Sequence, residues 1–392
     1  MQLELNPYNP GSGAQPMHLA GRDAEIAAFD LLIVRTKKHL QARPMVLSGL
    51  RGVGKTVLLR RLKGLADHHG WITIKLEARR GESAQQEARK VIAAELQSAA
   101  RRLVPLLHAG DYVRKALSTV TSFTATAGVK GISLGVSVDP TRASTGHLEI
   151  DLKDLVEDLS TALKKQRSGF VIFIDEMQDL DDELLGALIS AQHHANQEQL
   201  PFFVVGAGLP NLPGRLAEIR SYAERAFDYR IIGKLSPDAT RDAFTQPAKS
   251  VGQHYSHEAL ELMIEASGMY PYFVQEFGSA MWESALKSPF TPDDAEAAIT
   301  LGREKLDAGF FVARWQRATK AERRFLHAMA QDGEGPSSTG DIASKMGKKP
   351  TALGPARATL IDKGLIYSPE YGHVAFTVPG MAGFIARQEL LD

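Results

Sequence analysis

The chain has 392 residues, 44% of them hydrophobic, which is enough for two or three domains with sizeable cores. Lysine plus arginine and aspartate plus glutamate both number 46, so the net charge is zero and any surface for nucleic acid or membrane must be local. The absence of cysteine excludes disulfides and thiolate metal sites. Residues 1–16 lack the basic and apolar regions of a signal peptide, and no apolar run could span a bilayer. We therefore expect a soluble, cytoplasmic protein without a membrane partner.

The first 233 residues alternate between predicted helices and strands. We expect helices over residues 23–40, 55–68, 82–107, 151–165 and 183–196, and strands over residues 45–48, 71–76, 170–174, 202–205 and 227–232. The segment Phe170–Ile174 is continuously apolar, as in a strand of a sheet that is covered on both faces. The alternation predicts an α/β domain in which a parallel sheet lies between layers of helices.

One segment of this first part departs from the alternation. In Thr121–Val138, small side chains alternate around Gly128 and Gly131, and this pattern predicts a β-hairpin inserted at about residues 110–147. We expect the hairpin to decorate the surface of the sheet domain. The alternative is that it contacts DNA or a partner, for which Lys130 is the one cation available.

The pattern becomes mainly helical after Leu235. Ser236 followed by Pro237 is typical of a helix start, and further helices are expected over residues 257–267, 272–286 and 292–306. We predict a helical domain over residues 234–310 and a third domain over residues 311–392.

A glycine-rich turn lies between the predicted strand at 45–48 and the helix at 55–68. Residues 49–56 have the sequence GLRGVGKT, a full match to the phosphate-binding pattern G-x-x-x-x-G-K-[ST]. Glycines let successive backbone N–H groups face an anion, and the following helix adds its N-terminal dipole. Lys55 would reach the β- and γ-phosphates of ATP, and Thr56 would bind Mg²⁺. The alternative is an ordinary glycine-rich turn, but pattern and context agree on a phosphate site. The predicted nucleotide-binding residues of this turn are Gly49, Gly52, Val53, Gly54, Lys55, Thr56 and Val57.

Two carboxylates follow the apolar strand at 170–174. Asp175 is placed to hold Mg²⁺ directly or through water, and Glu176 is placed to polarise the attacking water as a general base. Acidic residues also end strands for purely structural reasons, but the phosphate-binding turn upstream favours the functional interpretation.

Both motifs and the order of elements resemble AAA+ or STAND-type P-loop ATPases, in particular initiator-like members with a helical lid and a C-terminal winged helix. The resemblance covers nearly the whole chain. The segment Leu19–Phe29 is similar to the box that lies against adenine in that family, which implies a role for Gly21 and Arg22. The segment Ser267–Phe277 is similar to the lid motif whose proline touches the nucleotide, here Pro271.

The chain also departs from the AAA+ pattern. The strand at 202–205, which resembles the sensor 1 strand, runs into glycines instead of a polar residue, and the lid stretch 269–273 contains no sensor 2 arginine. Both departures favour slow hydrolysis and a STAND-like switch. Arg215, Arg220 and Arg225 follow sensor 1, and one of them would act as an arginine finger if the protein forms a homo-oligomer. We rank Arg225 first because it lies next to the strand at 227–232; a solvated helix face is the alternative.

The last part of the chain has the pattern of a winged helix-turn-helix. Helices are expected over residues 321–330 and 339–346, the second with Thr339 as N-cap, followed by a helix to about Asp362 and two short strands around Tyr371. On or before the third helix lie residues suited to phosphates or base edges, namely Lys348, Lys349, Thr351 and Arg357. Winged helices also bind proteins or pack on their own ATPase domain, so these alternatives stay open.

We expect an ATP-binding, slowly hydrolysing ATPase that uses Mg²⁺ and couples its nucleotide state to DNA binding. The alternative is a signalling or defence switch whose winged helix binds a protein partner. The two hypotheses differ in DNA affinity and its dependence on salt. A chaperone-like remodeller fits less well, because no aromatic pore-loop pattern is present.

Overall fold

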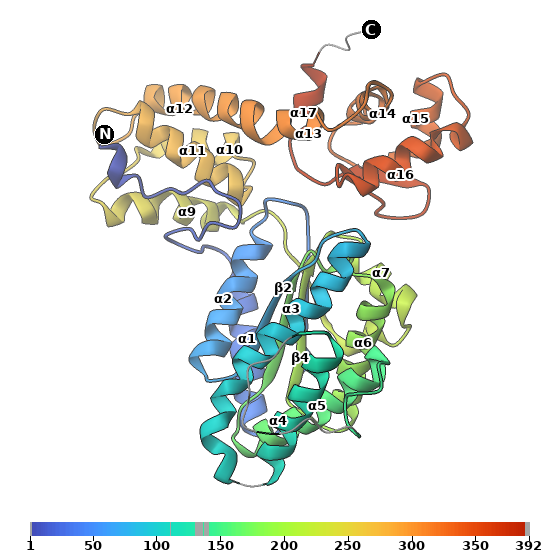
Figure 1. Cartoon of the computed structure of the whole chain (residues 1–392). Coiled ribbons are helices and arrows are strands. Elements are labelled where there is room, and N and C mark those ends of the chain that lie inside the picture. Colours follow the sequence, from blue (N-terminus) through green and yellow to red (C-terminus); the bar gives the residue numbers. More distant parts are fainter. Residues whose placement is uncertain (1, 110, 130–135, 137–140, 389–392) are drawn as a thin grey trace.

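In a computed structural model, residues 2–109, 111–129, 136 and 141–388 are described, and they contain two sheets (Figure 1). The larger sheet has five strands in the order β2-β3-β4-β1-β5, and all of its pairings are parallel. Its strands are β1 (Met45–Ser48), β2 (Ile72–Glu77), β3 (Phe170–Asp175), β4 (Phe202–Gly208) and β5 (Asp228–Ile231). The prediction of a parallel α/β sheet is therefore confirmed.

Helices cover both faces of this sheet. One face carries α1 (Asp23–Lys37) and α2 (Lys55–His68); the other carries α3 (Glu82–Ala100), α4 (Asp111–Thr126), α5 (Leu148–Lys165), α6 (Asp182–Gln197) and α7 (Leu212–Ile219), and the short α8 (Ala223–Ala226) precedes β5. Alternate residues of β3 serve the two faces: Ile172 packs with the α3–α7 layer, whereas Phe173 packs with Phe29 of α1. Because strand side chains alternate, a continuous apolar run fills both layers at once.

The predicted hairpin at 121–138 is wrong where the structure describes it. Residues up to Thr126 belong to α4, which is packed against α5, and residues 130–135 and 137–138 lie outside the described residues. The helix is explained by buried residues at helical spacing, Val113, Ala116, Val120 and Phe123. The hydroxyls of Thr121 and Thr126 bond to carbonyls four residues earlier, so they satisfy themselves within the helix.

A second layer of helices lies above the carboxyl end of the sheet (Figure 1). It begins with a helical lid made of α9 (Pro237–Ser250), α10 (His257–Ala266), α11 (Pro271–Ser284) and α12 (Pro292–Lys305). Helix α12 continues into a π-helical turn, Leu306–Phe311, and then into α13 (Val312–Trp315). Thr291 caps α12 in a capping box with Asp294, which fixes where this long helix begins.

The C-terminal unit follows α13 and contains α14 (Lys320–Ala330), α15 (Thr339–Lys345), α16 (Gly354–Asp362) and α17 (Met381–Ala386). Its three-stranded antiparallel sheet has the order β6-β8-β7, formed by β6 (Ser337–Ser338), β7 (Ile366–Tyr367) and β8 (His373–Phe376). The N-cap of α15 is Ser338, whose hydroxyl accepts N–H groups of the first turn, and the predicted cap Thr339 instead donates to the carbonyl of Gly372.

Lid and C-terminal unit share one apolar core. Phe311 connects them, because its ring contacts Phe273 of the lid and stacks on Phe384 of α17 at 5.3 Å between centroids. A Cβ at Gly380, which has a positive φ of 78°, would meet the Phe311 ring at 3.0 Å. The two units therefore pack through a common aromatic joint beside the π-helical turn.

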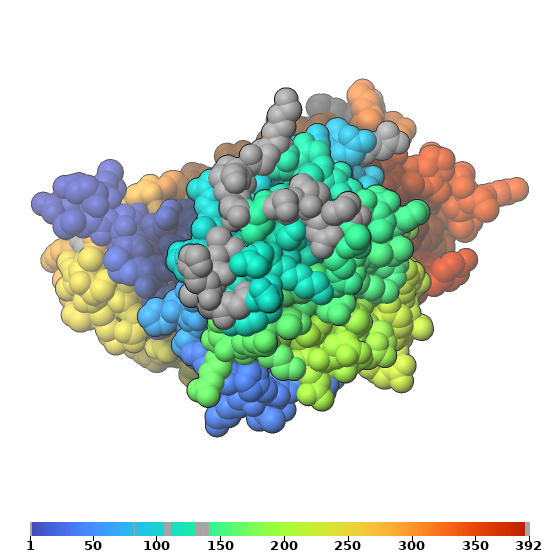
Figure 2. Space-filling view, turned by 60° about the horizontal axis from the view of Figure 1, so that its bottom comes forward, coloured from blue at the N-terminus to red at the C-terminus, as the bar shows by residue number. Residues whose placement is uncertain are grey.

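The N-terminal segment lies along the lid. The buried ring of Tyr8 fills the space above Gly278, and its hydroxyl donates to the carbonyl of Phe244 and meets the hydroxyl of Tyr255. Asn6 adds a hydrogen bond to Ser279. Figure 2 shows this dark-blue segment beside the yellow lid, while α3 to α6 form the face turned to the viewer. Among the described residues, no helix has both the length and the apolar character needed to cross a membrane.

Candidate active site

The turn between β1 and α2 has a geometry that its glycines make possible. Gly52 and Gly54 have positive φ angles of 84° and 90°, which other residues rarely adopt. A Cβ at Gly49 would lie 2.1 Å from the carbonyl oxygen of Ile232, so the neighbouring segment leaves room for glycine alone. Gly54 caps α2, which places the helix N-terminus and its positive dipole end at the mouth of the turn.

Lys55 lies buried inside this turn. Its ammonium group donates to the carbonyls of Gly49 at 2.8 Å and Leu50 at 2.7 Å. Burial lowers the pKa of Lys55 to about 8, although Glu176 and Asp175 nearby favour the charged form and oppose that shift. A buried cation that is hydrogen-bonded only to neutral carbonyls is strongly stabilised when an anion enters the turn.

Thr56 and Asp175 meet at the carboxyl end of β3. The Thr56 hydroxyl bonds to the buried Asp175 carboxylate, and burial raises the pKa of Asp175 above the usual range of aspartate. Mg²⁺ in phosphate-transferring sites takes one or two protein oxygens and fills its remaining positions with phosphate and water. A hydroxyl and a carboxylate in contact, next to a phosphate-binding turn, fit that donor set.

Glu176 has both carboxylate oxygens engaged. Its backbone is left-handed, with φ of 51°, which turns the side chain out of the strand direction. One oxygen forms an ion pair with the Arg51 guanidinium at 2.9 Å, and the other accepts a hydrogen bond from the Gln178 amide at 2.7 Å. The sequence did not indicate a role for Gln178, because its position shortly after the strand is the only signal that it carries.

These residues open onto a cleft of about 540 Å³, which is the size of a small-molecule site. Five parts of the chain form its walls. The lining residues used below are Arg51, Gly52, Gly54, Lys55, Thr56 and Val57 from the turn, Asp175 and Glu176 from β3, Pro271 and Tyr272 from the lid, and Phe310 and Arg314 from the joint.

The fifth wall is the N-terminal segment. Residues between Asn9 and Ala20 line the cleft, and a Cβ at Gly13 would lie 3.2 Å from the Thr56 methyl group. The predicted box is displaced by a few residues: His18, Leu19 and Ala20 line the cleft, whereas Gly21 and Arg22 are not among its lining residues.

Arg22 instead supports the turn from behind. Its buried guanidinium donates to the carbonyl of Val53 at 3.0 Å and to the carbonyl of Gly233 at 2.7 Å. Gly21 has a φ of 64°, and a Cβ there would clash with Ala239 of the lid at 2.7 Å. The pair therefore joins the turn, the end of the sheet and the lid.

Arg314 is a cleft residue that the sequence analysis missed. Its guanidinium lies 4.1 Å from the centroid of the Phe310 ring, which in turn stacks on Tyr272 at 4.7 Å. Among the described residues, no carboxylate pairs with this guanidinium, and its donated hydrogen bond goes to the Phe310 carbonyl. Burial, together with nearby Arg51, lowers the pKa of Arg314 to about 10. The only sequence signal is an arginine four residues after an aromatic residue in a helix.

The three candidate arginine fingers differ in their surroundings. Arg215 donates to the carbonyl of Leu180 and pairs with Asp182, and Arg220 pairs with Glu149. Arg225 is exposed on α8 and has no ion pair among the described residues. It is therefore the one of the three whose side chain is available to a neighbouring subunit.

The candidate DNA contacts also divide into two kinds. Lys348, Lys349 and Thr351 are exposed in the turn before α16. Arg357 is half-buried, and its guanidinium donates to the Ser368 hydroxyl at 2.9 Å, so it joins α16 to the β7–β8 hairpin.

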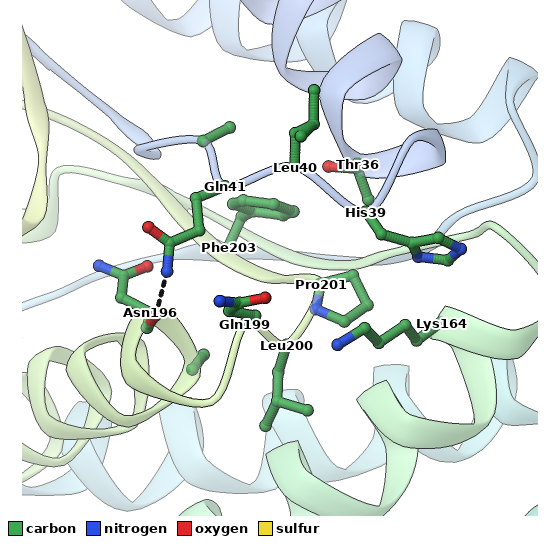
Figure 3. Close-up of a pocket in the computed structure, with 12 residues that line it drawn as sticks. Thr36, His39, Leu40, Gln41, Lys164, Asn196, Gln199, Leu200, Pro201 and Phe203 are labelled. Atoms are coloured by element: carbon green, nitrogen blue, oxygen red, sulfur yellow. Dashed lines mark hydrogen bonds between the residues drawn. The ribbon is translucent and has the colours of Figure 1, made fainter.

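A second, much smaller pocket lies at the opposite end of the sheet (Figure 3). Its volume is about 30 Å³, and it lies between the ends of α1, α5 and α6, where Gln41 donates to the Asn196 carbonyl at 2.8 Å. Ligands of parallel sheets bind outside the carboxyl ends of the strands. This pocket holds no more than a few water molecules.

Strand, glycine turn, buried lysine and paired carboxylates define a P-loop nucleotide hydrolase. The family of AAA ATPase domains matches residues 18–205. Residues 18–205 therefore form an AAA ATPase domain of the P-loop type, and this assignment supports ATP hydrolysis as the activity of the domain. Residues 308–385 match a family described as a domain of unknown function.

One solved structure supports the fold, and two more distant ones are similar to the chain. The Walker-type ATPase of Pyrococcus abyssi is 16% identical, with a TM-score of 0.54 over 94% of this chain and 99% of that one. The Aeropyrum pernix Orc1 protein, solved in complex with DNA, is 17% identical, with a TM-score of 0.44 over 95% and 93%. The Holliday junction branch migration motor RuvB of Thermotoga maritima is 14% identical, with a TM-score of 0.44 over 93% and 96%. A comparison with curated protein sequences finds no match.

Proposed function

We propose that this protein is a slow, STAND-like switch ATPase of initiator type, in which the bound nucleotide sets the DNA affinity of a C-terminal winged helix. The supporting observation is the composition of the cleft walls. Phe310 and Arg314 come from the joint between lid and C-terminal unit, so the same cleft is lined by the phosphate-binding turn and by the segment that carries the C-terminal unit. A change in the bound phosphates therefore changes the contacts that Phe310 and Arg314 make at that joint.

The residues of the cleft divide the work of hydrolysis. Backbone N–H groups of the turn and Lys55 bind the phosphates, while Thr56 and Asp175 would hold Mg²⁺, which would supply positive charge at the phosphate oxygens. Glu176 orients the attacking water and accepts its proton. Pro271 and the N-terminal segment close the cleft on the side of the base and ribose. Arg225 contributes only if a second copy docks against α8.

DNA is the proposed output because Lys348, Lys349 and Thr351 are exposed together and, within the described part of the chain, neither lysine forms an ion pair. A protein partner is the second candidate. It is favoured by the low charge of α16, whose only cation before Asp362 is Arg357, and that cation is bonded to Ser368.

The first test concerns the nucleotide. Lys55→Ala is expected to abolish ATP binding, and Glu176→Gln to keep binding while turnover falls by about 100-fold, as is typical when general-base catalysis is removed. Binding of a fluorescent ATP analogue and phosphate release measure the two effects. Unchanged turnover in Glu176→Gln would refute the assignment of the base.

The second test concerns the output. Fluorescence anisotropy of a labelled duplex is measured with ATP, ADP and no nucleotide, each with Mg²⁺ and at two salt concentrations. We expect micromolar or tighter binding that differs between ATP and ADP, weakens steeply with salt, and is lost in the double variant Lys348→Ala, Lys349→Ala. The matched control removes two exposed, consecutive lysines of the ATPase domain, Lys37→Ala at the end of α1 and Lys38→Ala directly after it. If the protein binds no DNA in any nucleotide state, the DNA-binding proposal is wrong and the protein-partner switch is favoured.

A further inference from the structure

Glu176, the proposed general base, is held by two residues to which the sequence motifs give no role. Arg51 pairs with one carboxylate oxygen of Glu176, and Gln178 donates to the other. Each carboxylate oxygen can still accept a second hydrogen bond, but the two contacts together fix the direction of the carboxylate, so Glu176 can turn toward an attacking water only when these contacts shift. Whatever controls these two contacts therefore controls hydrolysis.

Arg51 is tied to the C-terminal unit through its backbone. Its N–H donates to the carbonyl of Thr377 at 2.8 Å, directly after β8. Its guanidinium also lies beside Gly364, where an added Cβ would be 3.6 Å away. The residue before it, Leu50, packs against an apolar cluster whose members belong to β4's end and the C-terminal sheet. The P-loop arginine thus takes its position from the C-terminal unit.

Gln178 is tied to the same place by a different route. Its side-chain oxygen accepts the backbone N–H of Leu209 at 3.1 Å, immediately after β4. A Cβ at Gly208 would lie 2.3 Å from that oxygen, so the strand end is shaped to receive this side chain. The side chain of Leu209 is buried against Tyr367 and Ala375 of the C-terminal sheet.

Both routes end on one apolar contact, which we call the sheet contact: Leu209 and Leu50 on the ATPase side, Tyr367 and Ala375 on the C-terminal side. Along β7 and β8, successive side chains point alternately to the two faces of the sheet. Ile366, Val374 and Phe376 point into the core of lid and C-terminal unit, whereas Tyr367 and Ala375, which are paired across the strands, form the sheet contact. The sheet contact is therefore separable from the core that folds the unit.

We propose that Arg51 and Gln178 are positioning residues of the general base, and that docking of the C-terminal sheet on the sheet contact keeps Glu176 in its doubly bonded, non-hydrolysing position. Undocking moves the Thr377 carbonyl and Leu209, loosens both holders together, and lets the Glu176 carboxylate turn toward the attacking water. This inference rests on the proposed function in one respect only, the role of Glu176 as base. It adds that the C-terminal unit acts back on hydrolysis.

The experiment measures kcat and KM for ATP in the full chain carrying Tyr367→Ala or Arg51→Ala. Tyr367→Ala weakens the sheet contact without touching the cleft, and Ala375→Gln is a second variant at the same contact in case the first destabilises the unit. The matched control is Tyr371→Ala, since Tyr371 lies in the same hairpin and is fully exposed at 102%. Arg51→Lys keeps a cation beside Glu176 and tests for rescue.

We expect kcat to rise about tenfold in Tyr367→Ala, Ala375→Gln and Arg51→Ala, roughly what one charge-assisted hydrogen bond contributes, with KM for ATP nearly unchanged. The double variant Arg51→Ala, Tyr367→Ala should be no faster than either single variant, because both act on one carboxylate. Arg51→Lys should return kcat toward the original value, and Tyr371→Ala should not change it.

A merely structural role predicts a loss of kcat or a rise in KM, and not acceleration. If the folded sheet-contact variants bind ATP and hydrolyse it at the original rate or more slowly, the inference is overturned. If the unaltered chain hydrolyses ATP but Glu176→Gln turns over equally fast, the proposed function fails at the base, which is a separate result.

Discussion

Nucleotide affinity should depend on alkaline pH through Lys55. The perturbation is a change from pH 7 to pH 9.5 at constant Mg²⁺. In the free protein, the pKa of Lys55 is lowered to about 8 because the ammonium is buried among carbonyls. Bound phosphates favour the charged form and return the pKa toward its usual value of about 10.4. Binding therefore takes up a proton whenever Lys55 is neutral beforehand.

The size of the effect follows from the two pKa values. With a free-state pKa of about 8, proton uptake on binding is about 0.1 at pH 7, about 0.5 at pH 8 and about 0.9 at pH 9. The same linkage weakens binding by about 30-fold between pH 7 and pH 9.5. The sign is fixed: the free-state pKa is lowered, so affinity is full below about pH 8 and is lost as the pH rises.

Isothermal titration calorimetry measures both quantities when it is run in two buffers with different ionisation enthalpies. The other charged groups around Lys55 are Asp175, Glu176 and Arg51. As a control, Lys305→Met removes another lysine that lines the cleft and should leave the pH profile as it is. An affinity that stays constant to pH 9.5, without proton uptake, would refute the reasoning about Lys55.

Three further predictions concern other parts of the site. Because burial raises the pKa of Asp175, we expect Mg²⁺-dependent nucleotide affinity to fall on acidification at a higher pH than an exposed aspartate would give, and Asp175→Asn to remove that fall in a Mg²⁺ titration. Arg314→Ala should reduce the preference for ATP over ADP by about tenfold, as for one charge-assisted hydrogen bond, whereas exposed Arg303→Ala should leave it unchanged in competition binding. Tyr8→Phe removes the hydrogen bond to the Phe244 carbonyl and the partner of the Tyr255 hydroxyl, and it should cost about 1–3 kcal/mol of unfolding free energy in a urea titration, with exposed Tyr371→Phe as control.

The sequence predicted best what is local in the chain. The glycine turn, Lys55 and the carboxylates after β3 are adjacent in sequence to the elements that position them, so pattern and spacing were sufficient to place them. The bounds of α2 and the sheet strands were predicted to within a few residues, because apolar runs and glycines mark both ends.

The hairpin prediction failed for a physical reason. Threonine favours strands on average, and the short alternation after Thr121 matched a strand. In α4 the hydroxyls bond to their own helix, and Phe123 continues the helical spacing of buried residues set by Val113 and Val120. Packing against α5 thus overrides the propensity of the individual residues.

The remaining contacts join residues far apart in the chain and have no local signal. Arg51 meets Thr377, and Arg314 enters the cleft from the joint after α12. The family resemblance implies a role for Arg22 at the nucleotide through its backbone, and it gave no sign that the guanidinium bonds to the carbonyls of Val53 and Gly233. A single sequence does not show whether an arginine is bonded to backbone or free to meet a ligand.

The burial of Tyr8 in the lid has a consequence for biosynthesis. Its carbonyl partner Phe244 lies 236 residues later in the chain, so on the ribosome the first residues made must wait until most of the protein has been translated before they reach their place. During that interval, the sheet domain can fold, but the space above Gly278 and the wall beside Thr56 stay incomplete. The nucleotide cleft is therefore assembled last, and a nascent chain gains a closed cleft only when both its earliest and its late segments are present.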